Sequence, residues 1–203
     1  MHQSVPVRTR VAAGTLACAA ALAAVSGTVT ACSSGTGDEP AQHPEVGSSA
    51  ATPAPDSGLA ADAVPAVARE GVEDCPYLDT QFVAETNGQK VTASGTDARF
   101  DTPACVYWSY PEQPQLQVIV RHTGSPAEAR AVIDWAAPVD LTDPAEQPAG
   151  WSGGRAGGGV VPGREGAVYA VAKDTVAVVV LTNQKESVKA QLIAVETIAN
   201  LSL

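Results

Sequence analysis

The sequence offers few side chains that could carry out catalysis. It contains three histidines, of which only His122 lies in the part of the chain that we expect to fold. A hydrolase or transferase could use this imidazole as a general base, oriented by a carboxylate such as Asp101 or Asp134. Since His122 sits at the end of a predicted strand, we expect a packing or capping role for it. We therefore expect no catalytic residues and keep the His122 enzyme as the alternative hypothesis.

No cofactor or metal site is expected. A zinc site would lack the cysteine and histidine ligands that it needs. Asp140, Asp143 and Glu146 could bind calcium, but their spacing does not match an EF-hand loop. The glycine-rich stretch between Gly150 and Gly166 contains neither a P-loop nor a dinucleotide-binding glycine pattern. We interpret these acids as solvated surface charges.

The N-terminal 31 residues have the organisation of an export signal. Arg8 and Arg10 precede an uncharged run over residues 11–29. This run is mostly Ala, Gly, Ser and Thr, which makes it too weakly apolar for a retained membrane span. We therefore predict a signal peptide over residues 1–31, removed during export.

Cys32 is the strongest candidate for covalent modification. The preceding Val29-Thr30-Ala31 and Cys32 together resemble the lipobox of bacterial lipoproteins, in which the thiol is lipidated and the cysteine becomes the first residue. Cys18 is a weaker candidate, because Thr15 stands where a lipobox has a larger apolar residue. We predict a protein anchored by lipid to the extracytoplasmic face of the cell membrane, with simple secretion as the alternative.

Export decides how the other two cysteines behave. Cys75 and Cys105 are then the only remaining pair in an oxidising compartment, so we expect them to form a disulfide. A bridge across about thirty residues stabilises a domain by roughly 3–4 kcal/mol in the chain-entropy description. A redox-active role is the alternative, but the Cys-x-x-Cys motif is absent.

Composition separates a linker from a domain. Residues 32–71 are rich in Pro, Ala, Ser and Gly and show no apolar period, so we predict a disordered tether. Without the signal, which has two of the twelve basic residues and none of the 22 acidic ones, the formal net charge is −12. Nucleic acid is therefore not an expected partner.

Residues 72–203 are expected to form a single α+β domain. Asp74 and Gly88 would start and stop a helix over residues 76–85. The Ser125-Pro126-Ala127-Glu128 capping box predicts a helix that ends at Pro138. A last helix is predicted over residues 185–199, with a buried stripe of Val188, Leu192, Val195 and Ala199. Alternating apolar residues predict strands over residues 90–96, 104–110, 116–121, 168–172 and 176–182.

Residues 140–166 are predicted to form one long loop. The loop has no apolar period and holds eight glycines between Gly150 and Gly166. Trp151, Arg155 and Arg164 lie within it, and an aromatic ring with two cations is a combination common at binding hot spots. We predict a binding loop at these three residues, with a plain surface loop as the alternative.

Several short motifs resemble those of a family of actinobacterial exported lipoproteins that share a domain of unknown function. They are Asp74-Cys75-Pro76-Tyr77, Phe100-Asp101-x-Pro103-Ala104-Cys105, Ser109-Tyr110-Pro111, Pro148-Ala149-Gly150-Trp151, Tyr169-Ala170-Val171 and Thr182-Asn183-Gln184. The resemblance implies a PsbP-like α+β fold, an antiparallel sheet flanked by helices, and brings no catalytic residues. We therefore expect a non-enzymatic binding or accessory protein, whose partner is an unknown envelope protein or a small apolar ligand.

Overall fold

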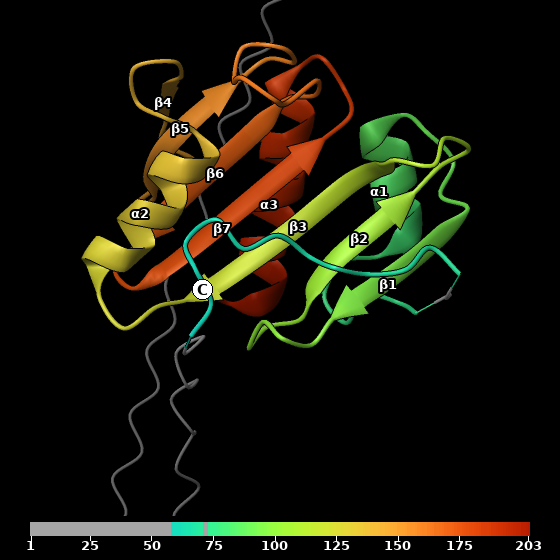
Figure 1. Ribbon diagram of the computed structural model, residues 1–203, viewed down its shortest axis with the longest axis horizontal. Coiled ribbons are helices and arrows are strands. Elements are labelled where there is room, and N and C mark those ends of the chain that lie inside the picture. The colour runs from blue at the N-terminus through green and yellow to red at the C-terminus, as the bar shows by residue number, and fades with distance from the viewer. Residues whose placement is uncertain (1–57, 71–72) are drawn as a thin grey trace, which may run out of the picture. The chain divides into compact units, whose positions relative to one another are not determined.

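The structure is a computed structural model that describes residues 58–70 and 73–203 (Figure 1). The predicted signal peptide, the predicted lipidation site Cys32 and the first part of the predicted linker lie outside these residues. No helix in the described ranges is long and apolar enough to cross a membrane.

Seven strands form one antiparallel sheet. In chain order they are β1 (Ala93–Asp97), β2 (Ala104–Trp108), β3 (Pro114–His122), β4 (Asp143–Ala145), β5 (Ser152–Ala156), β6 (Val168–Lys173) and β7 (Val176–Thr182). Their spatial order is β1-β2-β3-β7-β6-β5-β4, so the two halves of the chain meet where β3 pairs with β7. The predicted α+β class with an antiparallel sheet is confirmed.

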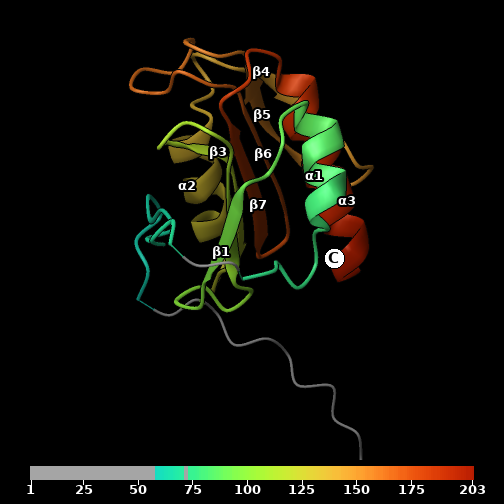
Figure 2. The same ribbon diagram turned by 90° about the vertical axis from the view of Figure 1, so that its right-hand side faces the viewer.

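Helices cover both faces of the sheet. The helices α1 (Thr80–Asn87) and α3 (Ser187–Leu201) lie on one face, and α2 (Pro126–Ala136) lies on the other, as Figure 2 shows. We call these the α3 face and the α2 face. The helix α3 packs on β6 and β7, whereas α2 packs on β5, β6 and β7.

Side chains of the central strands alternate between the two cores. Leu116, Val118 and Val120 of β3 face α1 and α3, while Ile119 faces α2. The strand β7 behaves in the same way, and both of its sides are buried. An apolar run of this kind is typical of a central strand that is covered on both sides.

Residues 59–70 form a strap across the half of the α2 face that α2 leaves open, passing over β3, β2 and β1 (Figure 1). Arg121 of β3 donates to the carbonyl oxygens of Leu59 and Ala60 at 3.1 and 3.0 Å. The amide of Ala66 donates to Asp97 Oδ2 at 2.9 Å. Arg69 donates to the carbonyl of Pro111 at 2.7 Å.

The strap corrects the predicted boundary between tether and domain. We expected residues up to 71 to be disordered, but residues 59–70 pack against the sheet through their odd-numbered side chains. Val67 lies where a side chain on Gly95 would be, since a Cβ there would come within 2.5 Å of Val67 Cγ1. The packed domain therefore begins near residue 59 and not at residue 72.

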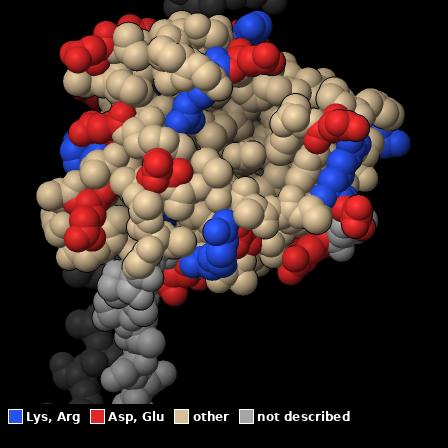
Figure 3. Space-filling model, viewed as in Figure 1, with Lys and Arg blue, Asp and Glu red and all other residues tan. Residues whose placement is uncertain are grey.

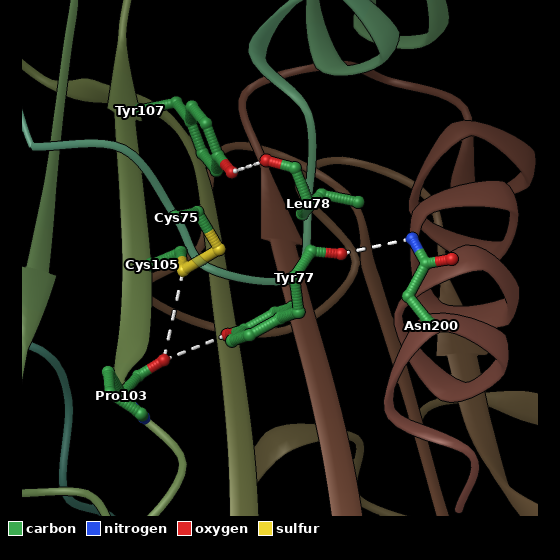
Figure 4. Close-up of a disulfide and its surroundings, with 7 residues drawn as sticks. All are labelled: Cys75, Tyr77, Leu78, Pro103, Cys105, Tyr107 and Asn200. Carbon is green, nitrogen blue, oxygen red and sulfur yellow. Dashed lines mark hydrogen bonds between the residues drawn. A yellow bond between two sulfur atoms is a disulfide. The ribbon is translucent and has the colours of Figure 1, made fainter.

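A disulfide joins the segment before α1 to β2 (Figure 4), as predicted. Cys75 and Cys105 have a Cα–Cα distance of 5.7 Å. The Tyr77 hydroxyl donates to the carbonyl of Pro103 at 2.9 Å, and the Tyr107 hydroxyl donates to the carbonyl of Leu78 at 2.8 Å. These bonds fix the same segment on the α3 face, where Asn200 of α3 also donates to the carbonyl of Tyr77.

Two helix predictions need correction. The helix α1 begins at Thr80, and its cap is Asp79, which accepts from Gln81 and Phe82, and not Asp74. In α3 the predicted buried stripe faces outward: Val188 and Leu192 are 53% and 52% exposed. The helix instead buries Ala190, Ile193, Ala194, Thr197 and Ile198. Because α3 is apolar on both sides, its sequence period did not decide which side meets the sheet.

Residues 140–166 are not one long loop. They contain β4 and β5, which extend the sheet beyond β6. The glycines serve close packing: a Cβ on Gly153 would lie 2.0 Å from the carbonyl oxygen of Ala170, and one on Gly166 would lie 1.6 Å from that of Thr182. The composition that suggested a flexible loop instead lets backbone segments approach each other.

Candidate functional site

The three residues predicted for a binding loop do not lie together. Trp151 is only 4% exposed and belongs to the core of the α3 face, with Lys173 Nζ 5.9 Å from its ring centre. The prediction that its ring forms a contact surface is therefore wrong. Arg155 follows on β5 and lies on the same face of the sheet. Arg164 lies on the opposite face, beside α2.

Arg164 holds a loop against the end of α2. Its guanidinium lies 4.6 Å from the centre of the Trp135 ring, and its Nη2 donates to the Trp135 carbonyl at 3.4 Å. Burial lowers the pKa of Arg164, and its Nη1 is buried with no hydrogen-bond partner among the described residues. A cation beside the last carbonyls of a helix stabilises that helix end. We assign Arg164 a structural role.

A hollow of about 530 Å³ lies beside Arg164 on the α2 face. Gln117 and Leu181 line it from β3 and β7, together with residues 163–167. Figure 3, which views this face, shows the surface hollowed near the end of β7 and the start of β3. The guanidinium at its wall lies over the Trp135 ring and donates to the Trp135 carbonyl through Nη2, whereas its Nη1 has no hydrogen-bond partner among the described residues.

A second cavity, of about 280 Å³, lies on the α3 face at the edge of the sheet, and we call it the Arg155 pocket. Residues of β4, the segment after it, β5, β6 and α3 form it. It is lined by Pro144, Ala145, Glu146, Gln147, Arg155, Tyr169 and Gln191. Most of the lining groups are polar, which favours a polar ligand over an apolar one.

Tyr169 shapes the floor of the Arg155 pocket. Its hydroxyl donates to the carbonyl of Gln147 at 2.7 Å and accepts from the amide of the same residue at 3.1 Å. The side chain is buried, and burial raises its pKa, so the hydroxyl stays protonated at neutral pH. Both hydrogen bonds hold the segment after β4, including the cis bond between Gln147 and Pro148, over the pocket.

The charge of Arg155 is unpaired. Its side chain is half-buried and makes no hydrogen bond or ion pair with any residue in the described ranges. The acid Glu146 lines the same pocket and likewise has no such partner there. A guanidinium that the fold leaves free in a cavity can bind a ligand without first breaking a protein contact.

His122 lies at the end of β3, away from both cavities described above. Its Nε2 is 2.9 Å from the hydroxyl of Thr102. Asp101 is exposed on the connection between β1 and β2, and Asp134 is exposed on α2. The hypothesis that one of these acids orients His122 for catalysis stays a hypothesis. No cluster of three potential metal ligands occurs within the described part of the chain.

One serine has the sequence spacing of a catalytic nucleophile. Gly150, Ser152 and Gly154 have the spacing of the serine turn in many hydrolases. That turn connects a strand to a helix, whereas Ser152 begins the strand β5 and accepts a hydrogen bond from Arg130 at 3.2 Å. The spacing is therefore a coincidence of the glycine-rich sequence.

The fold and the pocket define an α+β domain with an antiparallel seven-stranded sheet between helices and a polar cavity at one edge. The chain belongs to the family described as Domain of unknown function (DUF2020), which matches residues 59–203. This match begins at the first residue of the strap, in agreement with the corrected domain boundary. No curated protein matches the sequence.

Proposed function

We propose that this protein is a lipid-anchored, non-enzymatic binding module of the cell envelope, and that its ligand site is the Arg155 pocket. The observation that carries the proposal is the half-buried residue Arg155, which has no hydrogen bond or ion pair with the described residues and lines a pocket made mainly of polar groups. A half-buried cation without a protein partner can bind a ligand without first breaking a protein contact.

Sequence features support the location and the class. The export signal and the lipobox at Cys32 support anchoring at the extracytoplasmic face of the membrane. The resemblance to PsbP-like proteins supports an accessory role, although a fold alone does not determine function. The strong negative charge of the chain argues against nucleic acid as a partner.

The residues that line the pocket limit the class of ligand that it can bind. An apolar molecule would remove water from Arg155, Glu146 and two glutamine side chains without replacing their hydrogen bonds, which costs free energy. A polar small molecule, or a polar group of an envelope component, would replace them. We therefore favour a polar ligand over the small apolar ligand considered from the sequence.

Native mass spectrometry of the protein, gently solubilised from its own membranes, tests this function. The covalent mass should exceed that of residues 32–203 by acyl chains and fall by two hydrogens for the disulfide. A non-covalent mass should accompany the wild-type protein and the matched control Arg130→Gln, which changes an exposed arginine on α2, but not Arg155→Gln. A bare wild-type protein, or an unchanged bound mass in Arg155→Gln, would refute the pocket as the site.

A second candidate is an envelope hydrolase or transferase that uses His122. The observation in its favour is the 2.9 Å contact between His122 and the Thr102 hydroxyl, because a base beside a hydroxyl can activate it as a nucleophile. A panel of ester and amide substrates would test this candidate. Turnover that is lost in both Thr102→Val and His122→Gln would support it, and turnover that survives either change would exclude it.

A further inference from the structure

The Arg155 pocket contains one charge of each sign. Arg155 lies on β5, and Glu146 lies just after β4. The two side chains line the same cavity, yet no ion pair joins them, so their charged groups are more than the 4.0 Å of an ion pair apart. Glu146 is exposed and Arg155 is half-buried, so the two charges border one open pocket and a ligand that enters it can contact both.

Neutral polar groups complete the pocket. Gln191 reaches it from α3, and Gln147 reaches it from the segment after β4. Each amide can both donate and accept a hydrogen bond. The Tyr169 hydroxyl is already committed to the backbone of Gln147 and therefore acts as a wall.

We propose that the Arg155 pocket binds a small zwitterion with one carboxylate and one ammonium group, of which a free amino acid is the simplest example. This inference rests on the proposed binding function. Arg155 would bind the carboxylate through its planar fork, and Glu146 would bind the ammonium group. The cavity of about 280 Å³ is slightly below the usual range for drug-sized ligands, which agrees with a small molecule.

Other ligand classes fit the charges less well. A simple anion gains from Arg155 but is repelled by Glu146. A simple amine gains from Glu146 but is repelled by Arg155. Only a ligand with both charges turns each of these side chains into an attractive contact.

Titrations followed by two-dimensional amide NMR of the detergent-solubilised, isotope-labelled protein test the inference. The probes are each of the twenty amino acids and, for the one that binds most tightly, its N-acetyl derivative and its carboxamide. We expect saturable shifts at the amides of Gln147, Arg155 and Gln191. Each derivative should bind at least about tenfold more weakly, because each removes one charge-assisted contact.

Variants of Arg155 and Glu146 test which charged group of the ligand each side chain binds. Arg155→Gln and Glu146→Gln should each weaken binding of the zwitterion by about tenfold or more. Glu146→Gln should also remove the preference for the amino acid over its N-acetyl derivative. The matched control is Glu112→Gln, which changes an exposed acid on the connection between β2 and β3 and should leave binding unchanged.

The outcomes separate this inference from the proposed function. If the N-acetyl derivative binds as tightly as the amino acid, the zwitterion is refuted and the pocket remains an anion site. If no probe shifts the pocket while native mass spectra retain a mass that depends on Arg155, the ligand class is wrong and the binding function stands. If the native protein is also bare, both proposals fail.

Discussion

The Arg121 side chain makes one of the contacts that join the strap to the sheet. It is 3% exposed, donates to two strap carbonyls and lies 5.7 Å from the centre of the Phe100 ring. Arg121→Met keeps the apolar stem but removes both donors, so we expect unfolding to need about 1–3 kcal/mol less free energy. Urea denaturation measures this change. Arg130→Met is the control, because Arg130 is exposed on α2 and its replacement should lower the free energy of unfolding much less.

Hydrogen exchange adds a local measurement for the same variant. Loss of the Arg121 contacts should increase exchange at the amide of Ala63, which bonds within the strap to the carbonyl of Ala60. Amides of β7 should keep their protection. Unchanged exchange at Ala63 would show that other contacts hold the strap without Arg121.

Asp97 makes the middle of the strap sensitive to acid. The hydrogen bond from Arg99 is the main reason that the pKa of Asp97 falls from its ordinary 3.8 to about 2, and the amide of Ala66 also contributes. A carboxylate with a lowered pKa stabilises the fold above its ordinary pKa and loses this effect as the pH falls through the lowered value. We expect the protection factor of the Ala66 amide to decrease between about pH 4 and pH 2.

Asp97→Asn supplies the comparison for this pH dependence. The variant has no carboxylate to titrate, so its Ala66 amide should be less protected at neutral pH and should lose little more in acid. Parallel pH profiles for the wild type and the variant would show that Asp97 does not control the strap.

At the scale of elements, the start of α1 distinguishes the structure from the sequence prediction. Asp79 accepts hydrogen bonds from two amides of the first turn, whereas Asp74 is exposed before the helix. Asp79→Ala should therefore lower the free energy of unfolding by about 1 kcal/mol, and Asp74→Ala should change it little. Thermal melts of both variants measure the difference. Equal losses of stability in the two variants would show that Asp79 is not the cap of α1.

Elements with strong local signals were predictable. The capping box at Ser125 correctly predicted α2, because the cap and the apolar period agree there. The strands β6 and β7 and the disulfide were also predicted correctly. The free Arg155 was named as a binding residue, but its pocket depends on β4, β5, β6 and α3 meeting in space, which no local pattern reveals.

Elements whose local signal was misleading were predicted incorrectly. Glycines near Gly153 suggested a loop, although they permit the close backbone packing of β5. In the strap, half-buried odd-numbered positions alternate with exposed ones, which is a period of two. Alanines at both kinds of position hide this alternation in the sequence. The only clear traces of it are Leu59 and Val67 on the buried side and the acids Asp62 and Glu70 on the exposed side.

For the whole molecule, the position of the strap determines which first residue a shortened chain can have without losing stability. A chain that starts at residue 58 should unfold at the same temperature as the chain that starts at residue 32. A chain that starts at residue 73 should lose about 2–4 kcal/mol, because the apolar side chains of the strap no longer cover the sheet. Calorimetry of the three chains measures this. Equal melting temperatures for all three chains would show that the strap contributes little to the stability of the domain.

The strap also determines how the domain would respond to mechanical force. A pull from the N-terminal side reaches residue 59 first, where only non-covalent contacts resist it, and peels the strap from β3 toward β1. Peeling stops at Cys75, because its covalent bond to Cys105 transfers the load to β2. If the chain is anchored through Cys32, tension in the envelope would uncover the surface around Phe100 and Arg121 while the sheet stays intact.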